Sequence, residues 1–179
     1  TVILSGAALD DNLSTLQTIN SFTFNGVAQT KFTANSNGWM TIGGTAAATT
    51  TAGYTALSGT IASTGATGVI APLAGDMASA SAASEVRWEY LSATNETVIQ
   101  WSNFQRWNLI GDNFNFQVRL NHTTNTISFV YGTMTPASST SYFQVGIKSA
   151  LTAGVVGTTL NSLTTANIPA GTTCNWTNA

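Results

Sequence analysis

Side chains that commonly carry acid–base chemistry are scarce in this chain of 179 residues. His122 is the single histidine, and it lies in the turn-like segment 121–125, where a small polar residue would serve equally well. A serine triad would have to join His122 to Asp112 or Asp76, but no Gly-x-Ser-x-Gly elbow presents a nucleophile. We therefore expect no catalytic base here.

The acidic residues and the lone cysteine do not form a reactive set either. Glycoside hydrolysis needs two carboxylates facing one cleft. Glu85 and Glu89 share one strand face with Arg87 between them, a pattern that favours salt pairing. A zinc site needs four ligands, which one histidine and Cys174 cannot supply. We predict a protein that is not an enzyme and has no cofactor.

Calcium is the metal that the sequence leaves open. Asp10, Asp11 and Asn12 are consecutive oxygen donors in an expected loop, and Asp112 with Asn113 forms a second such group. Hard cations prefer oxygen ligands, but neither group forms a recognisable calcium loop. We interpret both groups as solvated turn residues, with a calcium site as the alternative.

The tryptophans offer a different kind of site, because sugar rings pack on aromatic faces. Three of them lie in expected strands and are predicted to be core residues: Trp39, Trp88 and Trp101. Trp107 lies in the segment 104–111, which follows a strand and mixes aromatic, amide and Arg groups that we expect to be exposed. We predict that Arg106, Trp107 and Asn108 line any ligand groove.

The strands that must position these residues are predicted from the alternation of apolar and polar residues. In 114–120 the aromatic and aliphatic residues share one face and the polar residues the other, as in a strand buried on one side. Asn-Gly pairs at 25–26 and 37–38 predict tight hairpin turns. The pattern predicts an all-β antiparallel β-sandwich or jelly roll with little or no helix. The Ala/Thr/Ser/Gly-rich stretches 43–68 and 78–84 are predicted to be surface loops or weak edge strands.

Composition narrows the classes of partner. Charged residues make up 7% of the chain and the formal net charge is −2, so no basic patch can follow a nucleic-acid backbone. No apolar run is long enough for a membrane helix. We expect one domain over 1–179. The chain starts at Thr1 without a leader, and we read it as an extracellular, exported chain whose signal peptide has been cleaved.

Several segments in order carry a resemblance. They are FTFNGV at 22–27, NSNGWMTIG at 35–43, VIAPL at 69–73 with Asp76, VRWEY at 86–90, VIQWSN at 98–103, NFQVRL at 115–120 and TNTISFVYG at 124–132. This series resembles a β-sandwich module of secreted cell-surface and adhesin proteins of Bacteroidota. The resemblance implies a non-catalytic sandwich and brings no catalytic residues. Ala74 and Gly75 stand where that family usually has Trp and an acidic residue.

Two functions follow from these observations. A nearly uncharged exterior favours a structural or adhesive module that self-associates, forming a fibre or filament, or binds other surface proteins. The N-terminal arm, 1–20, begins with Thr1, Val2, Ile3 and Leu4, which could complete a neighbour's sheet by strand addition, although an ordinary first strand is the simpler interpretation. The alternative function is a carbohydrate-binding, lectin-like module that uses the Trp107 segment.

Overall fold

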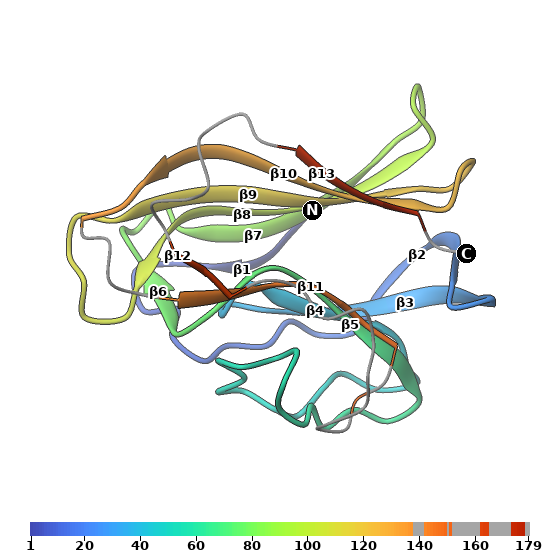
Figure 1. Ribbon diagram of the computed structural model, residues 1–179, viewed down its shortest axis with the longest axis horizontal. Helices are drawn as coiled ribbons and strands as arrows, with labels where there is room; N and C mark the ends of the chain where they lie inside the picture. The colour runs from blue at the N-terminus through green and yellow to red at the C-terminus, as the bar shows by residue number, and fades with distance from the viewer. Residues whose placement is uncertain (138–141, 150, 152–161, 165–172, 178–179) are drawn as a thin grey trace.

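Two antiparallel sheets face each other in the computed structural model, which confirms the predicted β-sandwich (Figure 1). The structure describes residues 1–137, 142–149, 151, 162–164 and 173–177. Within these residues every regular element is a strand, and no helix long and apolar enough to cross a bilayer is found. The contacts between the sheets build one main core.

The first sheet has the order β1-β7-β8-β9-β10-β13, and the short β6 also pairs with β8. Alternation is regular in β9, where Phe114, Phe116, Val118 and Leu120 are buried and the residues between them are half exposed. The outer face of this sheet therefore meets solvent. The strands are β1 (Val2–Ser5), β6 (Met77–Ser79), β7 (Glu85–Leu91), β8 (Glu96–Arg106), β9 (Asn113–Asn121), β10 (Thr126–Thr135) and β13 (Thr173–Thr177).

The second sheet is covered on both faces near its centre. Its order is β12-β11-β5-β4-β3-β2. The stretch 44–65, which connects β4 to β5, lies over its outer face, so Leu57 and Ile61 pack on Trp39 in a second apolar cluster (Figure 1). For this reason β4 and β5 are buried almost throughout rather than alternately. The strands are β2 (Gln17–Phe24), β3 (Val27–Asn35), β4 (Trp39–Gly43), β5 (Ala66–Ala74), β11 (Tyr142–Lys148) and β12 (Ser162–Thr164).

Aromatic side chains hold the two sheets together. The ring of Trp101 in β8 stacks on Phe116, with ring centroids 5.3 Å apart, and its indole N–H donates to the carbonyl of Asn35 in the other sheet at 2.8 Å. The Tyr131 hydroxyl donates to the carbonyl of Pro72 across the core at 2.6 Å. The polar tips of Trp101 and Tyr131 thus find partners in the opposite sheet.

The predicted tryptophan core is confirmed for the strand residues. Trp39 and Trp101 are fully buried. Trp88 is half-buried against the main core, where its ring meets the edge of Phe32 at 6.0 Å between centroids. None of these three rings is free to act as an exposed sugar platform.

The first residues pair within their own sheet. Strand β1 lies antiparallel to β7, and the Thr1 ammonium donates to the Trp88 carbonyl at 2.8 Å. The main-chain N–H of Trp88 donates back to the Thr1 carbonyl at 2.8 Å, and Ile3 and Leu4 pack against the core. This is the ordinary first-strand arrangement, so strand addition to a neighbour would first have to replace these contacts.

The Asn37–Gly38 turn between β3 and β4 is packed into the interior. Gly38 has a φ of 74°, and a Cβ at this position would collide with the main-chain carbonyl of Leu73. The turn at Asn25–Gly26 has a similar φ of 73° at Gly26 but nothing within 4 Å of the added atom. The two glycines therefore separate the effect of backbone conformation from the effect of close packing.

We expect Gly38→Ala to lower the free energy of unfolding by at least about 2 kcal/mol, because backbone strain is added to overpacking. Gly26→Ala carries the strain alone and is expected to lose about 1 kcal/mol. Denaturant unfolding of both variants measures the difference. Equal losses would show that the approach to Leu73 does not constrain the turn.

Deletion of residues 1–5 should lower the melting temperature by an amount that does not depend on protein concentration, because the β1–β7 bonds lie within one chain. Thermal unfolding at two widely separated concentrations measures this, and negative-stain images record the association state. Multimers of the full chain that vanish on deletion would instead support strand addition between copies.

Candidate functional site

A buried ion pair closes the base of the loop between β8 and β9. The Arg106 Nε lies 2.5 Å from Asp112 Oδ2 and its Nη2 lies 2.7 Å from Oδ1. Arg106 is only 3% exposed, and its guanidinium also lies over the Phe114 ring. The expectation of an exposed Arg106 is therefore wrong. Its two-point contact fixes the loop geometry instead.

Both carboxylate oxygens of Asp112 accept hydrogen bonds at the base of this loop. Oδ1 also accepts the Ala137 N–H at 2.6 Å, and Oδ2 accepts the Arg106 main-chain N–H at 3.2 Å. Burial alone would raise the pKa of Asp112, but the hydrogen bonds from Arg106 and the main chain outweigh it and lower the pKa. Calcium at Asp112 and Asn113 would have to compete with these donors.

Beyond the ion pair the loop turns toward solvent. Asn108 has a φ of 57° and Gly111 a φ of 106°, which bend the chain sharply. Trp107 is 49% exposed and Ile110 is 90% exposed. The main-chain N–H of Trp107 donates to the carbonyl of Asp76 at 2.9 Å, which holds this residue beside the turn after β5. The predicted exposure of Trp107 and Asn108 is confirmed.

Trp107 borders a pocket of about 300 Å³, which we call the Trp107 pocket. Its other walls are Asp10 from the N-terminal arm, Tyr54 from the connection between β4 and β5, and Asp76 from the turn between β5 and β6. Tyr54 is 39% exposed, so two aromatic rings with free surface lie beside two carboxylates. The structure brings Trp107 and Asp10 together, whereas Arg106 and Asn108 lie outside this lining.

A third carboxylate, that of Asp11, contacts the pocket wall residue Tyr54. Asp11 accepts hydrogen bonds from the Asn37 amide at 2.8 Å and from the Tyr54 hydroxyl at 3.1 Å. Burial, followed by the bond and charge of Asp11, raises the pKa of Tyr54 to about 12. Burial and the charges of Asp10 and Asp11 raise the pKa of Asp76. Both pKa shifts reflect the negative charge that these carboxylates place around the pocket.

The basic side chains of the protein lie elsewhere. All five belong to the described part of the chain, and none forms an ion pair with Asp10, Asp11 or Asp76. Their partners are Glu85 for Arg87, Asp112 for Arg106, Glu96 for Arg119, the Thr18 hydroxyl for Lys31 and the Gly59 carbonyl for Lys148. The negative charge of the Trp107 pocket therefore has no basic partner among the described residues, and the pocket should repel anions.

The described residues of this arrangement do not form a complete set of metal ligands. Among the described residues, no group of three or more His, Cys, Asp or Glu side chains is placed to hold an ion. The two Asp11 oxygens already accept from Asn37 and Tyr54, and the Asn12 side-chain oxygen accepts the Asp10 N–H at 2.7 Å. Solvated turn residues at Asp10–Asn12 stay the prediction, with calcium as its alternative.

His122 links the two sheets. Its Nε2 lies 2.8 Å from the Thr97 hydroxyl of β8, and its Nδ1 lies 2.9 Å from the Ser21 carbonyl of β2. The edges of Phe22 and Tyr90 meet its ring at about 6 Å between centroids. Both nitrogens are thus engaged in contacts that support the fold.

Two wall residues of the pocket were missed from the sequence. Asp76 was considered only as a triad partner of His122 and as the acidic residue that follows the VIAPL segment, not as part of a binding site. Tyr54 lies in the Ala/Thr/Ser/Gly-rich stretch 43–68 and, unlike Leu57 and Ile61 in the same stretch, it is exposed. The sequence did hold one signal for Tyr54. It is a lone aromatic residue in an Ala/Thr-rich stretch, so it has few local apolar neighbours to bury it.

The ion pair at the loop base generates a stability prediction. We expect Asp112→Asn to lower the free energy of unfolding at about pH 7 by about 3 kcal/mol, because Arg106 is left buried without its counter-charge. The control is Glu85→Gln, which removes a pair whose side chains are 49% and 26% exposed and should lose less than about 1 kcal/mol.

The same pair sets a pH dependence. The lowered pKa of Asp112 gives a stabilisation that is complete above its unfolded value of about 3.9 and is lost as pH falls through the folded value. The denaturant midpoints of wild type and Asp112→Asn should therefore approach each other as the pH falls below about 3.9. A gap that stays constant with pH would contradict the assignment.

Comparison with known proteins places the chain in a family. No curated protein and no solved structure matches the chain. A family model described as NIDO related matches residues 1–179. Domains of this kind are typically extracellular, which indicates an extracellular module. Because the match extends over the whole chain, this protein belongs to the NIDO-related family.

Proposed function

We propose that the domain is a non-catalytic extracellular adhesive module that binds glycans in the Trp107 pocket. The observation that supports this most directly is the pairing of two partly exposed rings, Trp107 and Tyr54, with two carboxylates around one hollow. A sugar ring can pack its C–H face on an indole. Carboxylate oxygens of Asp10 and Asp76 can then accept its hydroxyl hydrogens.

The charge of the pocket specifies the kind of sugar. Asp10, Asp11 and Asp76 have no basic neighbour to balance them within the described residues, where all basic side chains have other partners. A sugar acid would meet repulsion here, whereas a neutral sugar or an amino sugar would not. Neutral and basic glycans are therefore the expected ligands.

A binding role also suits the residues that might otherwise be read as catalytic. His122 uses both ring nitrogens to join the sheets, and Asp112 uses both oxygens to hold the loop. These contacts give each group a structural task. Recognition without chemical conversion is the function we assign to the pocket.

The test is glycan-array binding by wild type and Trp107→Ala. We expect wild type to bind neutral or amino-sugar glycans and Trp107→Ala to lose at least tenfold in affinity, because the stacking surface is gone. Ile110→Ala, in the same loop and 90% exposed, is the matched control and should bind as wild type.

Both variants should keep the wild-type melting temperature, since the two side chains are largely outside the core. An array without signal for wild type would contradict the proposed function. So would a Trp107→Ala variant that binds the same glycans unchanged.

A further inference from the structure

The outer face of the first sheet gathers much of the little charge that this protein has. The chain contains five Lys and Arg and seven Asp and Glu residues. Five of these side chains project from β7, β8 and β9 on the side away from the core: Glu85, Arg87, Glu89, Glu96 and Arg119.

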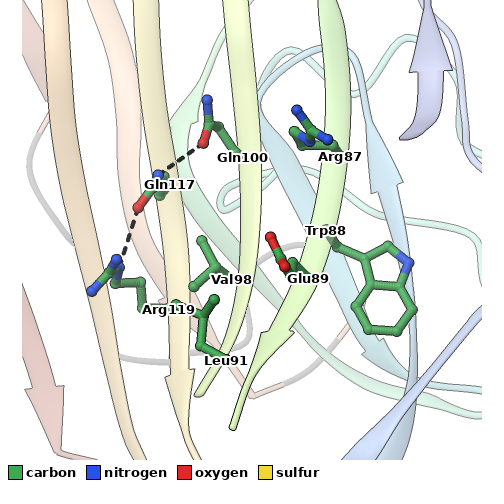
Figure 2. Close-up of a pocket in the computed structure, with 8 residues that line it drawn as sticks. All are labelled: Arg87, Trp88, Glu89, Leu91, Val98, Gln100, Gln117 and Arg119. Carbon is green, nitrogen blue, oxygen red and sulfur yellow. Dashed lines mark hydrogen bonds between the residues drawn. The ribbon is translucent and has the colours of Figure 1, made fainter. Parts of the chain in front are cut away.

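This face is hollowed. A depression of about 260 Å³ has Val98 at its centre and Leu91 beside it, with Arg87, Glu89, Gln117 and Arg119 around the rim (Figure 2). A second depression of about 130 Å³ adjoins it, because Gln100 and Gln117 line both.

The second depression extends to Val130 and Gly132 on β10. Together the two form a path across β7, β8, β9 and β10, which we call the outer trough. At a strand spacing of about 4.8 Å, the trough is about 14 Å long. It can therefore accommodate an elongated ligand.

The polar side chains in the trough are held in place by one another. Gln100 donates to the Ser102 hydroxyl at 2.6 Å. Gln117 donates to the Gln100 amide oxygen at 2.9 Å, and Arg119 donates to the Gln117 amide oxygen at 3.2 Å (Figure 2). Each amide nitrogen carries two hydrogens and uses one of them in this chain. The other hydrogens are available to a ligand at no cost in side-chain ordering.

The chemistry of the rim fits hydroxyl groups. Spare amide N–H groups donate, and the Glu89 carboxylate, which has no hydrogen bond or ion pair among the described residues, accepts. A sugar hydroxyl group can accept from the amides and donate to the carboxylate. The apolar centre consists of Val98, which is 8% exposed at the floor, and the half-buried Leu91, and together they offer a small surface for the C–H face of a sugar ring.

Charge balance indicates an uncharged ligand. Arg87 already has Glu85 at 3.2 Å, and Arg119 has Glu96 at 3.4 Å. Glu89 adds a further negative charge to the rim. Because each base has an acidic neighbour, a sugar acid would gain little here, and an amino sugar would meet both guanidinium groups.

We propose that the outer trough binds a short stretch of a linear, uncharged polysaccharide, at a site separate from the Trp107 pocket. Gln100 and Gln117 contact the sugar hydroxyls, and Val98 supports one ring. The trough lies on a sheet face and the Trp107 pocket at a loop, so the two sites can be tested independently.

The probes are three linear hexasaccharides, of β-1,4-linked glucose, β-1,4-linked N-acetylglucosamine and α-1,4-linked galacturonic acid, titrated calorimetrically into the full chain. We expect at least one of the two neutral probes to bind and the acidic probe not to bind. Binding should change less than twofold between low and high salt, because no net charge is neutralised.

The double variant Gln100→Ala with Gln117→Ala should weaken binding about tenfold, which is 1.4 kcal/mol at 25 °C. Val98→Thr keeps the β-branched shape but makes the centre polar, and should also weaken binding. Thr30→Ala, an exposed position of β3 in the other sheet, is the control and should bind as wild type. The melting temperatures of all variants verify that each is folded.

Failure of both neutral probes overturns the proposal, and so does binding of the acidic probe alone or binding that high salt abolishes. Trp107→Ala separates the two sites. If it removes neutral binding while the double variant keeps it, the trough is not the site and the Trp107 pocket is. If sedimentation shows self-association that the double variant abolishes, without sugar binding, the face is instead an interface between copies.

Discussion

The position of the Trp107 pocket depends on the buried amides of the turn between β3 and β4. The Asn37 side chain donates to Asp11 at 2.8 Å and accepts the Met77 N–H at 2.8 Å, so one residue ties the N-terminal arm to β6. Asn35 accepts the Asn37 N–H at 2.7 Å and donates to the Thr51 carbonyl at 2.7 Å. These bonds bring the walls of the pocket together, and Gly38 allows the turn to lie this deep.

The sequence predicted the sheets well because their signal is local. Alternation in 114–120 and the Asn-Gly turns depend on neighbouring residues, and both the class of fold and the strand tryptophans were correctly predicted. The exposure of Trp107 was also predicted. The double-sided burial of β4 and β5 was not, because it depends on how the distant stretch 44–65 packs.

The site was predicted less completely, for a related physical reason. Arg106 was expected in solvent, since no local pattern shows that Asp112, six residues later, turns back to pair with it. Tyr54 and Asp76 join Trp107 only through long-range contacts. The lining of this pocket is a property of tertiary structure, whereas strand alternation is a property of adjacent residues.

The Trp107 pocket has walls from four distant parts of the chain, at positions 10, 54, 76 and 107. Such a pocket cannot persist in an unfolded chain, so any occupant binds the native state alone. Saturation would then make the whole domain harder to unfold, by about 2.7 kcal/mol at a hundredfold excess over Kd. Attachment to a surface would by itself protect the domain against proteases, and release would make it more susceptible to turnover.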